Sequence, residues 1–176
     1  MGLHFDFDET DAFAAGAIGR PGERTFYLQV RAEGTTVCMK CEKFQVAELA
    51  RYLRAILSDM PDQGRVDPST ASLVGPVEED FVLRSIGLGV DRASSRVMIQ
   101  LEDVPSVDED DDAFDLMDDM DDGDDEDGSV VRALITPAQA RAFCEIADSL
   151  VASGREPCQW CGAPKDPTGH ACPRMN

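Results

Sequence analysis

Residues 130–150 read VVRALITPAQARAFCEIADSL, and this stretch determines the expected fold more clearly than any other. Val130–Ile135 is a run of apolar and β-branched residues, which is typical of a buried strand. Thr136 then offers an oxygen to cap a helix, Pro137 suits the first turn, and Gln139 can reach back to the cap. Apolar residues recur at intervals of three and four along one face of the helix that follows: Phe143, Ile146, Ala147 and Leu150. The sequence therefore predicts a strand that leads directly into an amphipathic helix.

A similar order of elements precedes this stretch. From His4 to Cys41, short aromatic and β-branched runs separated by Gly, Asp or Pro predict three or four antiparallel strands. Phe44–Met60 then changes to the helical period. Phe81–Leu88 and Arg96–Leu101 predict a hairpin. Each predicted helix carries a glutamine at its third position, so an internal duplication is one interpretation. We expect an α+β fold, in which a mainly antiparallel sheet carries both helices on one face.

The chain has 176 residues and a formal net charge of −19, and much of this charge lies in one segment. Residues 108–127 contain fourteen acidic and no basic residues, which leaves 21 acidic against 16 basic residues elsewhere. Self-repelling acidic residues favour a disordered insertion, placed at residues 105–128. The apolar residues that interrupt this segment could alternatively fold on a basic partner: Phe114, Leu116, Met117 and Met120. The sequence shows no basic face of the kind that nucleic-acid binding needs, so this function is disfavoured.

The expected organisation is one α+β domain over residues 1–154 and a small zinc-binding module over residues 155–176. The N-terminal sequence MGLHFDFDET carries acidic residues where an export signal would carry positive charge. No apolar run approaches the roughly 20 residues that span a bilayer. We therefore expect a cytoplasmic protein whose cysteines stay reduced.

The C-terminal module contains four residues with the chemistry of metal ligands. Cys158 and Cys161 are followed by a glycine, and His170 and Cys172 come shortly afterwards. Two thiolates separated by two residues can point at one tetrahedral ion. Four sulfur and imidazole ligands in such a short segment predict a structural zinc site without an open position for catalysis. A disordered tail with reactive cysteines and a redox-active pair are the alternatives.

Two further patterns suggest sites but have simpler interpretations. Cys38 and Cys41 repeat the Cys-x-x-Cys spacing inside a predicted strand, where residues three apart point to opposite faces, so we interpret them as core or edge thiols. The glycines of residues 16–22 indicate a hairpin turn rather than a phosphate-binding loop. Arg20 and Arg24 in this turn could nevertheless hold an anion.

Three motifs connect the chain to a known family. GRPGERTFYLQVR (19–31), EKFQVAELA (42–50) and CxxCGxPxDPxGHxCPRxN (158–176) resemble the actinobacterial family called domain of unknown function 3090. The resemblance covers most of the chain and implies that the four C-terminal ligands act as a unit. It also implies an association with a kinase-like and a histidine-phosphatase-like protein, which are often encoded nearby. The acidic insertion and the Cys38–Cys41 pair depart from the family pattern.

Together these features favour a cytosolic, non-enzymatic binding or adaptor protein whose acidic loop engages a basic surface of a partner protein. The only two histidines are His4 and His170, and the second is an expected metal ligand, so histidine-based catalysis is disfavoured. We leave open whether the protein has enzymatic activity that uses carboxylates or cysteines.

Two other functions stay open on the sequence alone. One is an enzyme or ligand-binding domain for a phosphorylated small molecule, with the site lined by Arg20, Glu23 and Arg24. The other is a zinc protein that contacts nucleic acid through Lys165, Arg174 and stacking by Trp160.

Overall fold

A computed structural model describes the chain at residues 2–61, 64–104, 128–154, 157–163, 165 and 169–174. The insertion predicted at residues 105–128 lies outside these residues except for Gly128. The elements follow the order β1 (His4–Phe7), β2 (Ala12–Ile18), β3 (Thr25–Ala32), β4 (Thr35–Cys41), α1 (Lys43–Ser58), the 3-10 helix η1 (Pro68–Ala71), β5 (Phe81–Val82), β6 (Ser85–Asp91), β7 (Arg96–Glu102), β8 (Val130–Ile135) and α2 (Pro137–Ala152).

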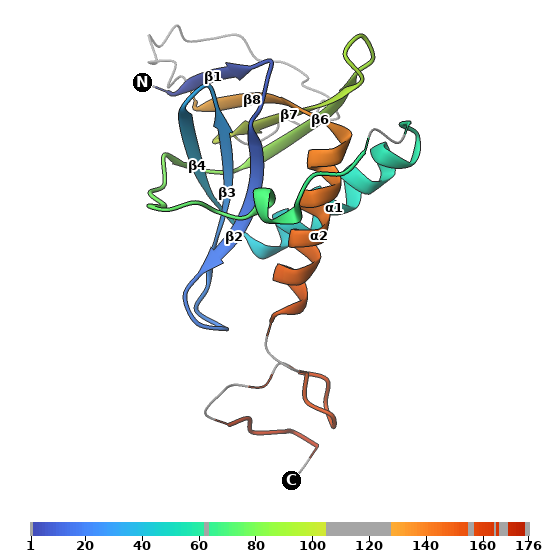
Figure 1. Cartoon of the computed structure of the whole chain (residues 1–176). Coiled ribbons are helices and arrows are strands. Elements are labelled where there is room, and N and C mark those ends of the chain that lie inside the picture. The colour runs from blue at the N-terminus through green and yellow to red at the C-terminus, as the bar shows by residue number, and fades with distance from the viewer. Residues whose placement is uncertain are drawn as a thin grey trace, which may run out of the picture.

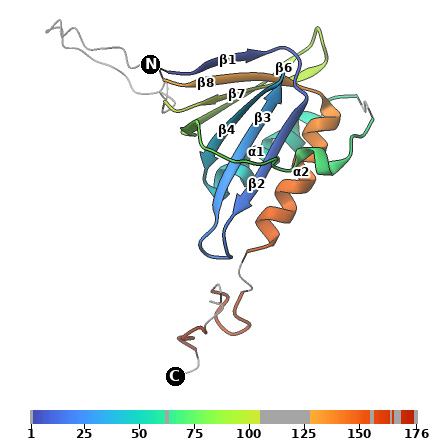
Figure 2. The same ribbon diagram turned by 60° about the vertical axis from the view of Figure 1, so that its left-hand side comes forward.

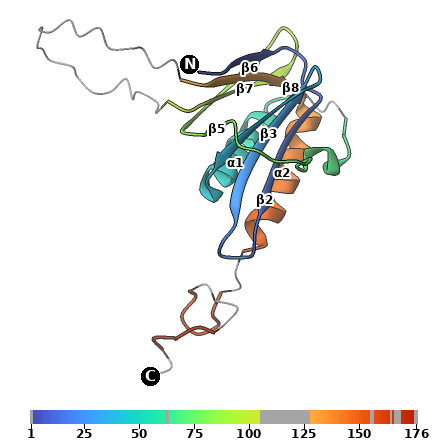
Figure 3. The same ribbon diagram turned by 90° about the vertical axis from the view of Figure 1, so that its left-hand side faces the viewer.

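The strands form two four-stranded sheets, ordered β1-β8-β7-β6 and β2-β3-β4-β5. Figures 1 and 3 show that the strands of the two sheets run in different directions and that α1 and α2 lie together on one side. Phe13 of β2 stacks on Phe143 of α2 with ring centroids 4.6 Å apart, which joins sheet and helix in one apolar core. The predicted α+β fold with both helices on one face is confirmed. The sheets are mixed, because β1–β8 and β4–β5 pair in parallel.

The topology divides the described elements into two similar units, each of four strands and an α-helix. β1 to β4 with α1 form the first unit, and β5 to β8 with α2 form the second. The first strand of each unit leaves its own sheet and pairs in parallel with the last strand of the other unit. The units have therefore exchanged their first strands, an arrangement that agrees with an internal duplication.

The two helices also begin in the same way. Gln45 accepts a hydrogen bond from the backbone N–H of Glu42 (2.7 Å), and Gln139 accepts one from that of Thr136 (2.8 Å). The other end of each amide reaches the loop after an exchanged strand: Gln45 donates to the carbonyl of Leu83 and Gln139 to that of Thr10. One glutamine in each unit thus caps a helix and holds the loop that follows the strand received from the other unit.

The segment between η1 and β5 crosses the outer face of the sheet that contains β3. Gln29 of β3 is fully buried and bonds both backbone groups of Val74: its Nε2 donates to the carbonyl (2.9 Å) and its Oε1 accepts from the N–H (3.0 Å). Arg31 donates to the carbonyl of Thr70 (2.8 Å). Two polar residues of β3 therefore hold η1 and the segment that follows it.

Replacing Gly16 with alanine should destabilise the protein, because the side chain of Leu73 occupies the space beside it. A Cβ atom at position 16 would lie 2.5 Å from Cγ and Cδ1 of Leu73. Overpacking of this kind costs about 1–3 kcal/mol of unfolding free energy, measurable by urea denaturation. Gly87→Ala is the matched strand control, since a Cβ there meets Gln100 at an ordinary 3.4 Å. Leu73→Ala should relieve part of the Gly16→Ala cost in the double variant; additive costs would contradict the proposed contact.

Candidate metal centre

The C-terminal module follows α2 and begins with a tight turn around Cys158. The N–H of Gly162 donates to the carbonyl of Cys158 (2.8 Å), and the N–H of Cys158 donates to the carbonyl of Ala163 (2.7 Å). Gly162 has a φ of 74°, a left-handed conformation that favours glycine, which explains the glycine after the second cysteine. Figures 1 and 2 show the module beyond the C-terminal end of α2.

The turn brings together the four predicted ligands. One ligand atom from each of Cys158, Cys161, His170 and Cys172 lies within 4.8 Å of all the others. The sulfur atoms of Cys158 and Cys172 are 3.8 Å apart, and the sulfur of Cys161 lies 3.1 Å from Nε2 of His170. All six cysteines of the chain are free thiols. The arrangement can therefore hold one metal ion with three sulfurs and one imidazole nitrogen.

Backbone N–H groups stabilise the thiolate form of Cys158, which is the form that binds a cation. The N–H groups of Cys161 and Trp160 bond the sulfur of Cys158 and lower the pKa of this thiol to about 6. The N–H of Arg174 has the same lowering effect on Cys172, but desolvation and the sulfurs of Cys161 and Cys158 outweigh it, so the pKa of Cys172 is raised. Neighbouring thiolates repel one another, and a cation between them removes this repulsion.

These backbone donors are the part of the site that residue spacing did not identify. The Cys-x-x-Cys-Gly sequence could have predicted these donors, because the turn it forms directs successive backbone N–H groups toward its first cysteine. Arg174 also donates to the carbonyl of Trp160 (3.4 Å), which places a cation beside the tryptophan. The indole of Trp160 is itself 55% exposed.

The other Cys-x-x-Cys pair lies apart from this centre, within β4. Cys38 accepts a hydrogen bond from Nε2 of Gln29 (3.3 Å), whereas Cys41 belongs to the apolar core. Burial raises the pKa of Cys41 to about 12, so this thiol stays protonated. The two side chains have separate environments, as expected for residues three apart in a strand.

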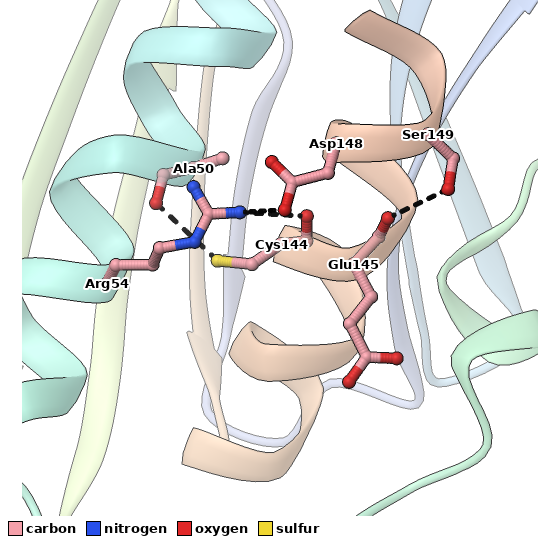
Figure 4. Close-up of polar contacts among 6 residues, drawn as sticks. All are labelled: Ala50, Arg54, Cys144, Glu145, Asp148 and Ser149. Carbon is pink, nitrogen blue, oxygen red and sulfur yellow. Dashed lines mark hydrogen bonds and ion pairs between the residues drawn. The ribbon is translucent and has the colours of Figure 1, made fainter. Parts of the chain in front are cut away.

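Cys144 is also a packing residue, located between the helices. Its thiol contacts the carbonyl of Ala50 at 3.5 Å, and burial raises its pKa to about 11. Figure 4 shows Arg54 of α1 beside it, with one guanidinium nitrogen donating to Asp148 (2.5 Å) and to the carbonyl of Cys144 (3.2 Å). The ion pair joins α1 to α2 at the surface. A protonated thiol in this environment is a poor nucleophile.

The proposed anion-binding arginines occupy the β2–β3 turn, where Arg24 already has protein partners. It donates to the carbonyl and the hydroxyl of Ser153 at the end of α2 (3.0 and 2.7 Å). Arg24 and Lys43 line a cavity of about 500 Å³ together with apolar residues of α2. Arg20 is exposed in the turn, and its carbonyl accepts from the N–H of Glu23 (2.9 Å). Arg20 does not line the cavity beside Arg24, and anion binding by the two arginines stays a prediction.

Fold and site define an α+β protein of two strand-exchanged units followed by a Cys3His cluster. The chain belongs to the family described as "Protein of unknown function (DUF3090)", whose sequence profile matches residues 5–172. This span includes all four residues of the cluster and both units except His4 at the start of β1. No curated protein and no solved structure matches the chain. Among the described residues, no helix has both the length and the apolar character needed to cross a membrane.

Proposed function

We propose that Cys158, Cys161, His170 and Cys172 bind one zinc ion that stabilises the C-terminal module. Typical zinc–sulfur and zinc–nitrogen bonds give a tetrahedron whose edges are about 3.8 Å between sulfurs and about 3.5 Å between sulfur and nitrogen. The 3.8 Å between the Cys158 and Cys172 sulfurs matches the first edge. The 3.1 Å between Cys161 and His170 needs only a small opening. This geometry is the observation that carries the proposal.

The proposed role of the ion is structural. Four protein ligands complete a tetrahedral shell, which leaves no open position for a substrate or an activated water. The module has few apolar residues of its own, so metal binding takes the place of an apolar core in stabilising it. The chain's residues supply the thiolates and the imidazole and hold them through the turn at Gly162.

For the whole protein we propose a non-enzymatic binding or adaptor function in the cytoplasm. The net charge of −19 suits a partner with a basic surface. Its partners could include the kinase-like and phosphatase-like proteins that the family resemblance implies. Cys41 and Cys144 support a non-catalytic role, because burial raises the pKa of these thiols to about 12 and about 11.

Elemental mass spectrometry of the protein purified under reducing conditions tests the zinc site. We expect about one zinc per chain in the wild type. Cys158→Ser and His170→Ala should each lose most of this zinc, because three ligands leave an incomplete shell. Cys38→Ser is the matched control from the other Cys-x-x-Cys pair and should keep its zinc.

Two results would contradict the proposal. A wild type that holds no zinc, even after refolding with the ion, would remove the metal site. Equal losses in Cys38→Ser and Cys158→Ser would instead indicate that folding of the whole chain, rather than the Cys3His cluster, determines the metal content.

A further inference from the structure

The two units present equivalent long edge strands, β2 and β6, that differ in what covers them. Along β2, Ser72 forms a parallel bridge with Ala15, and Ala71 is buried beside it. The core-facing side chains Phe13 and Ala15 of this strand are only 1% exposed. The chain itself thus covers the edge of one sheet with an extended segment.

The edge at β6 has no such cover among the described residues, where β6 pairs with β7 alone. Its core-facing side chains stand opposite fully buried residues of β7, in the pairs Ile86–Leu101, Leu88–Ile99 and Val90–Val97. Ile86 and Leu88 are nevertheless only half-buried, and Val90 is 43% exposed. Within the described residues, the same position in the fold is therefore covered in the first unit and uncovered in the second.

An apolar groove lies beside this open edge. It has a volume of about 380 Å³ and runs between the C-terminal end of α1 and the β6–β7 turn, which lie close together in Figure 1. Ile56, Met60 and Pro61 form one wall and Val90 the other. Asp59 and Arg92 also line it and carry opposite charges, so the groove has no formal net charge. A strand edge beside a helix is a geometry that captures extended peptides in other proteins.

The β6 strand lacks the usual protection against strand addition. Exposed edges are commonly blocked by proline, lysine or a bulge. Residues 85–91 contain neither proline nor lysine, and their register with β7 is regular throughout. Gly87 and Gly89 leave the outer face without side chains, and the single charge, Asp91, is bonded to Ser94 and the N–H of Ala93.

We propose that β6 binds an extended segment of a partner protein, which adds a strand to the sheet and places alternate apolar side chains in the groove. The net charge of −19 favours a segment flanked by Lys or Arg, because fourteen acidic residues lie at 108–127, shortly after Val104, whose carbonyl accepts from the Ser85 hydroxyl at the start of β6. Backbone hydrogen bonds to β6 supply affinity, and the wall formed by Ile56 and Met60 selects apolar side chains. This inference rests on the proposed binding function and names its site and the chemistry of its partner.

Fluorescence polarisation with labelled synthetic peptides tests the site on the full chain. The probes carry Val, Leu or Phe at alternate positions, with Thr between them and two lysines at each end. We expect at least one probe to bind the wild type. Val90→Lys places a charge in the groove and should weaken binding at least about tenfold, as should Met60→Lys on the other wall. The matched control is Val82→Lys, since Val82 is 47% exposed on β5, away from the groove, and this variant should bind within about twofold of the wild type.

Hydrogen exchange locates the bound peptide and decides between the outcomes. Protection confined to residues 85–91 and the end of α1 is the expected result. Failure of every probe to bind at about 1 mM, or equal weakening by Val82→Lys and Val90→Lys, overturns the proposal. A wild type that sediments as a dimer and becomes a monomer in Val90→Lys also overturns it, because a second copy then occupies β6. The zinc content is measured in the same preparations. A protein that holds zinc but binds no peptide contradicts the β6 proposal alone, and one that binds peptide but holds no zinc contradicts the zinc proposal alone.

Discussion

Chelation of the metal should change the fluorescence of Trp160 while the far-ultraviolet circular dichroism of the helices stays constant. Trp160 is the only tryptophan of the chain and lies between Cys158 and Cys161, so its emission reports on the module alone. Because Trp160 is only 55% exposed, unfolding of the turn should shift its emission to longer wavelength. Both helices belong to the α+β part, which has its own apolar core.

The shift in Trp160 emission should be large, because the ion is proposed to stabilise the fold of the module. Structural zinc contributes apparent binding energies of about 10–16 kcal/mol in small zinc modules, and most of this energy is folding energy. Zinc added after chelation should restore the original emission, whereas Mg²⁺, which prefers oxygen ligands, should not. His170→Ala should show the shifted emission without chelator. A parallel loss of the helical signal would show that the module and the α+β part unfold together, contrary to this expectation.

The sequence predicted the elements better than their pairing. The start of α2 was predictable because Thr136, Pro137 and Gln139 signal it within four residues. The exchange of β1 and β5 was not, because each pairs with a strand of the other unit and no local pattern encodes such a contact. β5, with two residues, is too short to produce an alternating pattern, and the predicted strand Phe81–Leu88 merged it with β6.

Prediction of the metal centre depended on chemistry that is local in sequence. Cys158 and Cys161 are close in the chain, and the loop to His170 and Cys172 is short, so spacing was sufficient to group them. The groove beside β6 had no such signal. Its walls include Ile56 and Val90, ordinary apolar residues that sequence patterns assign to a core, and only the three-dimensional structure places them together beside β6.

The burial of Gln29 could not be predicted from the sequence, because a polar residue in a strand is usually expected at the surface. The structure buries it completely and uses its amide to bond both backbone groups of Val74. Val74 belongs to the segment over residues 64–76, which includes the 3-10 helix η1. Its attachment could not be predicted, since the attaching residue lies more than 40 positions earlier.

Gln29→Ala should lower the unfolding free energy by about 2–4 kcal/mol, measured by urea denaturation. The substitution removes two hydrogen bonds to Val74 and the contact with Cys38, and it leaves a void in a fully buried position. Gln100→Ala is the matched control. Gln100 lies on the central strand β7 and bonds the side chain of Glu102, but it is partly exposed, so its loss should cost less than about 0.5 kcal/mol.

Hydrogen exchange distinguishes loss of this attachment from a general loss of stability. If Gln29 holds the loop, amides of residues 69–80 should exchange faster in Gln29→Ala than the global destabilisation alone requires, because the loop opens locally. Asp80 keeps its bonds with Cys38 and should limit the opening at the β5 end. Uniform acceleration across both sheets would mean that Gln29 contributes to the core only. Since the same loop supplies the Ser72 bridge that covers β2, its release would expose the edge of β2, the strand that corresponds to β6 of the second unit.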